Sequence, residues 1–337
     1  MINYSLQKIE NANIFLLLKA AEKLDINWTM LDDDRYEILL EKGSQAHVLH
    51  AHSFKLNSQE SIRLTKNKYQ THELLKKHRI PVLTKLQVKS ENEYLEIYQQ
   101  IPFPQVIKPA EGEKGRDVYL NIPDKAKALS ALRLVLKNYA SAIVEPYFAG
   151  HDLRIMVLGH QAIGLSRRHP PEIMGNGRQT IIQLINEENR RRSALRKKMG
   201  IKMLNRILNW KRIKWYLTKQ NLTLDSVLPK NKKVKLQELP NYSAGGWVET
   251  LSFREIHPSF IEMSEKISRL VGLTIVGIDW LIKDLQKPAQ AKGLSASGRN
   301  CAVLELNSDP GLRLHDLPNK GKPQQVSERV LKYIFNS

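Results

Sequence analysis

The sequence predicts an α+β (α/β) protein, in which amphipathic helices alternate with short apolar strands along a chain of 337 residues. Three observations lead to this fold class. Apolar residues recur at helical spacing in stretches such as Ile14–Leu24, and runs rich in β-branched residues such as Ile275–Ile282 predict buried strands. The composition, 42% hydrophobic and 26% charged, is typical of a globular protein long enough for two or three domains.

The first 55 residues or so have the pattern of a small α/β piece. A helix is expected over Ile14–Leu24, followed by short strands near Trp28–Met30 and Tyr36–Leu40. This stretch is too short to form a full domain, so we expect it to pack on the rest of the chain.

The next stretch predicts a helix and then a hairpin. Lys66–His78 has an apolar side and is stopped by Ile80-Pro81-Val82. A strand over Phe103–Pro109 leads into the polar loop Glu111–Asp117, which carries two glycines, and a second strand comes next at Val118–Leu120. Strand, glycine loop and strand form a hairpin, whereas a P-loop would continue into a helix.

The second half of the chain is richer in predicted strands, with a polar loop at Lys287–Arg299 between two of them. The remaining predicted elements are strands at 142–145, 153–157, 161–166 and 275–282, and helices at 125–139, 180–189 and 262–271.

Charge is the compositional outlier. Lys and Arg number 53 against 34 Asp and Glu, for a net charge of +19, and the pI is near 9.8. Such an excess favours anionic partners such as nucleic acid, nucleotides, phospholipid surfaces or acidic substrates, and it says nothing about the fold. The excess is concentrated between Arg190 and Lys219, so it needs a local explanation.

Cysteine usage and the N-terminus indicate a cytoplasmic protein. Cys301 is the single cysteine, which excludes an intramolecular disulfide framework and a cysteine-rich zinc site and fits a reducing compartment. The apolar run Ile14–Leu18 is short and is closely followed by Lys19 and Glu22. We therefore expect a core-facing helix there, with neither a signal peptide nor a membrane span.

Two lysines and a glycine loop are candidates for binding an anionic triphosphate. Lys108 ends a strand, Lys68 lies at the start of a helix, and Gly112 and Gly115 lie in the hairpin loop. Ammonium groups and glycine amides together can cradle phosphate oxygens. Taken singly, a lysine before proline is more typical of a solvated edge charge, and two glycines are more typical of a plain turn.

The segment Glu145, Pro146, Tyr147 and Phe148 comes directly after a predicted buried strand. In a nucleotide site such a segment can offer backbone groups to the edge of adenine. An interdomain hinge with packing aromatics is an equally good interpretation of these residues in isolation.

Charged residues on the next two strands are candidates for binding substrate. Asp152 and Arg154 lie two apart and share one strand face. Asp152 suits ribose hydroxyls and Arg154 suits a phosphate or carboxylate, with a surface ion pair worth less than about 1 kcal/mol as the alternative. Arg167 and Arg168 precede two prolines in what reads as a cationic turn, where an arginine could clamp a carboxylate.

Three oxygen donors near the end of the chain are candidates for a metal site. Asp279 lies in an apolar run, and Glu305 and Asn307 are two apart, so the latter two point to the same strand face. Buried carboxylates are costly unless they are paired or bind a metal. An Asp beside a Glu-x-Asn would suit Mg²⁺, a hard cation that binds nucleotide phosphates. Ordinary strand-end polarity is the more common meaning of such a pattern in isolation.

In their order along the chain, these motifs resemble those of the ATP-grasp ligases, especially the ATP-grasp module of cyanophycin synthetases and bifunctional glutathione synthetases. The resemblance implies an ATP-grasp fold, in which two α+β subdomains hold ATP between them. We expect a short preceding segment at 1–60, an N-terminal subdomain at 61–140 and a C-terminal subdomain at 141–337 with a basic insert at about 190–220. The motifs that carry the resemblance are Asn67-Lys68, Val106–Pro109, Val144-Glu145, Gly150–Arg154, Arg168–Pro171, Gly175–Gly177, Asn241–Gly246, Gly277–Asp279, Glu305–Asn307, Pro310-Gly311 and His315.

The resemblance also implies an activity and a set of roles. The activity is ATP-dependent ligation of a carboxylate to an amine through an acyl phosphate, on an amino acid or peptide. Arg154 and Arg168 would face the acyl phosphate or the substrate carboxylate. The implied ligands are Lys68, Lys108, Gly112 and Gly115 for the ATP phosphates, Glu145, Pro146, Tyr147 and Phe148 for adenine, Asp152 for ribose, and Asp279, Glu305 and Asn307 for Mg²⁺ (or Mn²⁺).

Some positions depart from the family pattern. Asp117 stands where relatives usually have glycine, and an acidic residue there could weaken ATP binding or shift the loop. Asn176 replaces the usual aspartate of Gly-Asp-Gly, Ala244 replaces a threonine, and the aspartate expected a few residues later is missing or shifted to Glu249. The last changes lie on the acceptor side, so neither glutathione nor cyanophycin is assumed as the product.

The basic segment leaves two interpretations open. Its cations are interleaved with Trp210, Trp215 and Tyr216. The pattern predicts either recognition of a polyanion, such as an acidic peptide or a tRNA-linked amino acid, or a solvated helical insert with aromatics packed on the body. The alternative to a ligase is therefore a non-catalytic ATP-grasp scaffold that binds nucleotide or a polyanion. Self-assembly into a homo-oligomer is a further expectation, because relatives are often dimers or tetramers.

Overall fold

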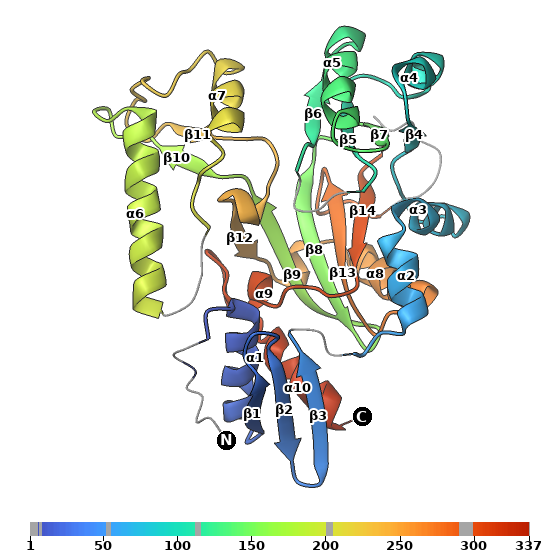
Figure 1. The fold of residues 1–337 in the computed structure, drawn as a ribbon, viewed down its shortest axis with the longest axis vertical. Helices are drawn as coiled ribbons and strands as arrows, with labels where there is room; N and C mark the ends of the chain where they lie inside the picture. Colours follow the sequence, from blue (N-terminus) through green and yellow to red (C-terminus); the bar gives the residue numbers. More distant parts are fainter. Residues whose placement is uncertain are drawn as a thin grey trace.

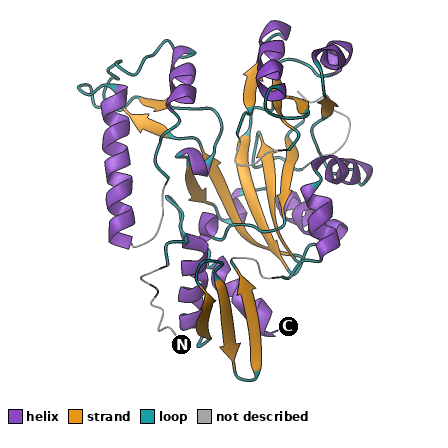
Figure 2. Ribbon diagram, in the orientation of Figure 1, coloured by secondary structure: helices purple, strands orange, loops and turns teal. Residues whose placement is uncertain are grey.

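The computed structural model describes residues 6, 9–51, 55–111, 116–199, 205–289 and 299–336, without the side chains of residues 196, 198 and 199. In this part of the chain, β-strands form four sheets. Figure 1 shows a central sheet with an N-terminal unit below it, a second sheet above it, and a lobe built around α6 and α7 to one side. Figure 2 shows the helices covering the outer faces of these sheets.

The N-terminal unit is a helix packed on a three-stranded antiparallel sheet of order β1-β2-β3. Asn11 caps the helix by accepting a hydrogen bond from the Asn13 N–H at 3.0 Å. The C-terminal helix shares the same hydrophobic core, so the two ends of the chain lie together (Figure 1). The elements are α1 (Ala12–Lys23), β1 (Asn27–Asp32), β2 (Glu37–Lys42), β3 (Gln45–His50) and α10 (Val326–Asn336).

The second sheet has the order β4-β7-β5-β6 and is covered by two helices. The sequence places a subdomain boundary at residue 140, yet the strand after this point pairs with β5 and β4. This sheet therefore extends one strand beyond the expected boundary, to Pro146. Its elements are β4 (Leu86–Val88), α4 (Glu91–Ile97), β5 (Gln105–Pro109), β6 (Tyr119–Ile122), α5 (Lys125–Leu136) and β7 (Ala142–Pro146).

The central sheet is antiparallel, with the order β12-β9-β8-β13-β14. Alternate residues of β13 face a core under α8, where Trp280 packs edge-to-face on Phe260 with ring centroids 5.4 Å apart. Because side chains alternate along a strand, Asp279 faces the opposite side. The elements of this layer are α2 (Gln59–Lys66), α3 (Lys68–Lys77), β8 (His151–Leu158), β9 (Gln161–His169), β12 (Trp247–Thr250), α8 (Pro258–Val271), β13 (Ile275–Ile282), β14 (Cys301–Asn307) and α9 (Arg313–Asp316).

The lobe at the side, which we call the insert unit, comprises the described residues between 172 and 246. It has its own hydrophobic cluster, in which Ile185 of one helix packs with Ile213 and Leu217 of the other. The predicted basic insert at 190–220 is thus part of a larger folded unit. Its elements are β10 (Glu172–Met174), α6 (Ile181–Met199), α7 (Trp210–Thr218) and β11 (Lys233–Lys235).

Most predicted elements are confirmed, including the strand Ile275–Ile282 and the β5–β6 hairpin. Two expectations are wrong. The N-terminal piece contains a third strand, β3, whose polar residues gave no apolar alternation. Arg167 and Arg168 lie within β9 and not in a turn, because pairing with β12 extends this strand to His169.

Candidate active site

A cavity of about 950 Å³ lies where the central sheet, the second sheet and the insert unit meet. The strands β5, β7, β8 and β14 contribute to its wall, as do α3 and the loop at residues 238–243. Of the predicted site residues, those that line it are Lys68, Lys108, Glu145, Pro146, Tyr147, Phe148, Asp152, Arg154, Arg168, Glu305 and Asn307.

One face of the central sheet carries a ladder of charges. The strand register sets Arg154 opposite Asp279 and Asp152 opposite Arg168. Arg154 donates to both carboxylate oxygens of Asp279, at 2.6 and 2.8 Å. Arg168 donates to Asp279 at 2.9 Å and to Asp152 at 2.6 Å. Two guanidinium groups and two carboxylates therefore form one linked group at the floor of the cavity.

This ladder is buried, which distinguishes it from an ion pair on the protein surface. Arg154 is 7% exposed and Asp279 is fully buried, so the surface-pair interpretation of Asp152 and Arg154 is wrong. Burial tends to raise the pKa of Asp279, but the two arginines outweigh it and lower this pKa to about 2. Burial raises the pKa of Asp152 to about 6, against the attraction of Arg168. Asp279 is thus firmly ionised and fixes both arginines.

The predicted metal ligands gather beside the ladder. Asn307 Nδ2 lies 3.3 Å from Asp279 Oδ2 and 3.5 Å from Glu305 Oε1. Glu305 is half-buried and faces the cavity. Carboxylate and amide oxygens are the ligands that Mg²⁺ prefers, so Glu305 and Asn307 fit a hard divalent cation. Both oxygens of Asp279 are engaged by Arg154, and its role as a third ligand stays a prediction.

Three lysines also line the cavity, Lys68, Lys85 and Lys108. Lys108 Nζ lies 2.5 Å from Glu145 Oε1, and Glu145 is 3% exposed. The other carboxylate oxygen of Glu145 is buried without a hydrogen-bond partner in the described part of the chain. Lys68 lines the same cavity, and so does Lys85, which no motif indicated. The one signal for Lys85 in the sequence is its place shortly after the helix-ending Pro81.

The segment Glu145–Phe148 lines the cavity as the expected adenine hinge would. The Tyr147 N–H donates to the Pro104 carbonyl at 2.8 Å, and Pro146 has no N–H. The Tyr147 N–H is therefore already engaged, and Pro146 can offer an adenine edge only its carbonyl. Asp152 lies beyond this segment and is bound to Arg168, so its contact with ribose stays a prediction.

The glycine loop is described at its ends. Gly112 and Gly115 lie outside the described residues, while Glu111 and Arg116 on either side line the cavity. Asp117 has a φ of +52°, a conformation that the glycine expected at this position would adopt at little cost. Its carboxylate accepts from the Tyr139 hydroxyl at 2.9 Å.

The far end of the cavity is lined by the insert unit. Residues 238–243 form its wall, and the Arg313 guanidinium stacks on the Tyr242 ring at 4.5 Å from the centroid. Two of the departures from the family pattern lie away from the cavity. Asn176 accepts from the Arg178 and Gln179 amides in a local turn, and Glu249 pairs with Lys320 and with His169 outside the cavity lining.

The basic segment divides into structural and exposed cations. Arg192 is 4% exposed and donates to the carbonyls of Asn205 and Gly245 at 2.6 and 2.8 Å, which ties α6 to the loop before β12. Lys211 and Lys214 on α7 are exposed. The fold thus uses some of the basic residues for packing and leaves others facing solvent.

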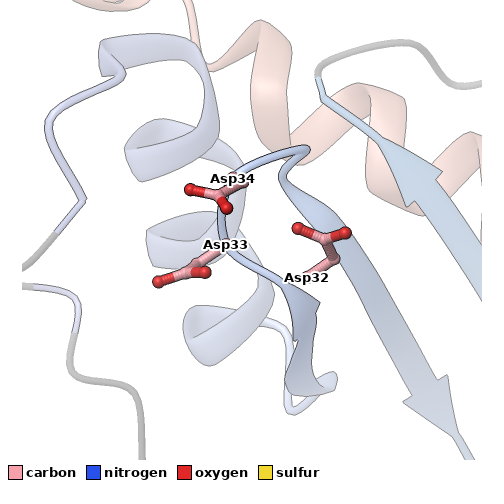
Figure 3. A group of neighbouring side chains, drawn as sticks. All are labelled: Asp32, Asp33 and Asp34. Carbon is pink, nitrogen blue, oxygen red and sulfur yellow. The ribbon is translucent and has the colours of Figure 1, made fainter.

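Elsewhere, the carboxylates of Asp32, at the end of β1, and of Asp33 and Asp34, in the turn that follows, lie close together (Figure 3). The turn belongs to the N-terminal unit, and none of the three residues lines the cavity. They form a solvated acidic turn, in which Asp32 accepts from the Arg35 amide at 3.0 Å. Among the described helices, none is long and apolar enough to cross a membrane.

Two antiparallel sheets that enclose a cavity lined by lysines and by a carboxylate–amide cluster define an ATP-grasp fold. The RimK-like ATP-grasp domain family matches residues 65–191, so the chain contains an ATP-grasp domain. The fold agrees with the crystal structure of a bifunctional glutathione synthetase from Pasteurella multocida at a TM-score of 0.71 and 22% identity, over 98% of this chain and 44% of that one.

Two proteins of known function are similar to this chain in sequence. The chain is 32% identical to a cyanophycin synthetase of Synechocystis sp. over 70% of its own length and 26% of the relative. It is 28% identical to a glutathione biosynthesis bifunctional protein of Mannheimia succiniciproducens over 98% of its length and 44% of the relative. The chain therefore spans about a quarter of the length of the first relative and somewhat under half of the second.

Proposed function

We propose that the chain is an ATP-dependent carboxylate–amine ligase that forms an amide or peptide bond through an acyl phosphate, on an amino acid or peptide. The observation that carries the proposal is the cavity of about 950 Å³, which is lined by lysines and by Glu305 with Asn307 and has the Arg154–Asp279 ladder as its floor. This set can neutralise a triphosphate and a carboxylate at the same time.

The chemistry is governed by charge. A carboxylate is a poor electrophile, and its negative charge repels ATP. Lys68 and Lys108 neutralise the phosphates, while Arg154 and Arg168 orient the substrate carboxylate, since their own positions are fixed by Asp279. A Mg²⁺ ion held by Glu305 and Asn307 would neutralise charge on the transferring phosphoryl group.

Two displacements complete the proposed reaction. A carboxylate oxygen attacks the γ-phosphorus, and the bond to the ADP oxygen breaks. The amine nitrogen then attacks the acyl carbon, and the carbon–oxygen bond to phosphate breaks, releasing phosphate and a proton. Glu111 and Arg116, on the hairpin between β5 and β6, line the cavity, and a cavity that excludes water protects an acyl phosphate from hydrolysis.

The test is ADP release on incubation with ATP, Mg²⁺ and a library of amino acids and short peptides, with the product identified by mass spectrometry. Hydroxylamine should trap the acyl phosphate as a hydroxamate when the amine is withheld. Failure of every carboxylate–amine pair to release ADP, in protein that binds Mg-ATP, would contradict the ligase proposal.

A second candidate is a non-catalytic scaffold that binds nucleotide or a polyanion. Both oxygens of Asp279 are engaged by Arg154, which motivates this alternative because a catalytic metal would have to compete for them. Calorimetric titration with Mg-ATP of the wild type and of Glu305→Gln separates the candidates. A scaffold binds Mg-ATP in both proteins without turnover, whereas a ligase turns over and loses this activity in the variant.

We further propose that the exposed cations of the insert unit bind an acidic partner, either an acidic peptide or a tRNA-linked amino acid. Lys197, Lys211 and Lys214 are exposed, and residues 238–243 join this unit to the cavity wall. Charge reversal at the three lysines should weaken use of an acidic peptide and flatten its salt dependence. Unchanged activity and salt dependence would refute the idea. The proposal includes a cytoplasmic location, where Cys301 would stay reduced.

A further inference from the structure

Lys85 occupies a position in the cavity that none of the motifs assigns. Its Nζ donates to the Leu304 carbonyl at 3.3 Å, one residue before Glu305. The side chain lines the cavity together with Lys68 and Lys108. Lys85 therefore lies between Lys108 and the cluster of Glu305 with Asn307.

The backbone leading to Lys85 is anchored at three consecutive carbonyls. Pro81 O accepts from the Val303 N–H at 2.7 Å, Val82 O accepts from Arg299 at 2.6 Å, and Leu83 O lies 2.7 Å from His72 Nε2. These bonds join the segment to β14 and to α3. Lys85 thus extends from a rigid support, which is what precise binding of a ligand requires.

The surroundings of Lys85 disfavour its positive charge. Burial, and then repulsion from Lys108, lower the pKa of Lys85 to about 8, while Glu145 and Glu305 act in the opposite direction. Glu145 already binds Lys108 at 2.5 Å, and Glu305 faces the predicted cation position. Crowding ammonium groups in a partly desolvated cavity is unfavourable unless an anion binds among them.

We propose that Lys85 is a third phosphate-binding lysine, which contacts the phosphate chain of the nucleotide between Lys108 and the cation position at Glu305 and Asn307. This inference rests on the proposed function, because it assumes that the nucleotide binds in this cavity. Lys85 is a substrate-binding residue, and its loss weakens the affinity for ATP.

The experiment compares calorimetric titrations of Mg-ATP and of ADP with four variants. Lys85→Met removes the charge and the donor, Lys85→Gln keeps an amide donor for Leu304, and Lys85→Arg keeps the charge. Lys89→Met is the matched control, because Lys89 is exposed and outside the cavity lining. A charge-assisted hydrogen bond accounts for a loss of roughly 10- to 100-fold in ATP affinity in the Met and Gln variants. Lys85→Arg should retain most of the affinity, and the control should match the wild type.

Each outcome decides between a binding role and a structural role. If Lys85→Gln binds Mg-ATP as tightly as the wild type, the charge is not used and the inference is overturned. If all three Lys85 variants lose binding and melt at lower temperature, Lys85 is structural and the inference also fails. If the wild type binds no nucleotide at all, the proposed function fails together with it, whereas binding by the wild type and by the Gln variant alike overturns the inference alone.

Discussion

The central sheet buries and pairs its charges, whereas the insert unit leaves several of its lysines in solvent. On the sheet, Arg154 is 7% exposed and lies in register with a carboxylate. In the insert unit, Asp225 is the one acidic residue of the sequence between 205 and 235, and Lys211 and Lys214 are exposed. Buried charges must be paired to be tolerated, and so they set the geometry of a site. Solvated lysines cost the fold little and are available to a partner.

The largest effect is expected from the neutral variant Glu305→Gln, which should lower turnover by about 10³-fold, because a bound metal supplies several kcal/mol to the transition state. Glu305 is only half-buried, so the thermal midpoint should not fall. The measurement is the rate of ADP release as a function of Mg²⁺ concentration. Chelation of the metal should abolish ADP release by the wild type in the same assay. Glu262→Gln on the exposed side of α8 is the control, and equal turnover in the two variants would contradict the metal site.

Next in size is the loss of stability in Arg154→Met. This change leaves the carboxylate of Asp279, which is fully buried, without its bidentate partner, and breaking such a pair costs about 3–5 kcal/mol. Urea denaturation measures the loss. The double variant Arg154→Met with Asp279→Asn should be less destabilised than the sum of the two single changes. A loss below about 1 kcal/mol in Arg154→Met would show that the ladder is far better solvated than its burial indicates.

A smaller effect is expected from Arg192→Met, a buried cation of the insert unit. The change removes hydrogen bonds to the carbonyls of Asn205 and Gly245, and hydrogen bonds to a charged group contribute about 1.5–3 kcal/mol. Urea denaturation again gives the magnitude. Arg190→Met is the matched control, since Arg190 lies on the same helix, α6, and is exposed. If the two variants have equal free energies of unfolding, the hydrogen bonds of Arg192 contribute no more to stability than an exposed cation does.

The smallest effect on stability is expected from Lys214→Glu. Surface substitutions away from special features change the free energy of unfolding by within about 0.5 kcal/mol. The same change should weaken binding of an acidic peptide, most visibly at low ionic strength. Fluorescence anisotropy at several salt concentrations measures this binding. Unaltered peptide affinity, or a large loss of stability, would contradict the idea that Lys214 is a solvated charge available to a partner.

Local pattern predicts much of this fold. The apolar periodicity of β13 and α8 depends on neighbours a few residues away, and the strand Ile275–Ile282 is confirmed at both ends. The third strand, β3, is not predicted because its polar residues show no apolar alternation. Its extended backbone is stabilised by hydrogen bonding to β2. The expected turn at Arg167 and Arg168 is wrong for the same reason, since pairing with β12 carries β9 through them.

The order of the motifs along the sequence was enough to predict the ATP-grasp fold, and it also proposed the lysines and the Asp279, Glu305 and Asn307 set as ligands. The tertiary structure decided which charges meet. Arg154 and Asp279 are 125 residues apart, and the register of two strands, which is a property of the assembled sheet, sets them opposite each other. The same holds for Lys85, whose place in the cavity is set by bonds to β14. Long-range pairing depends on the whole core, and no local pattern encodes it.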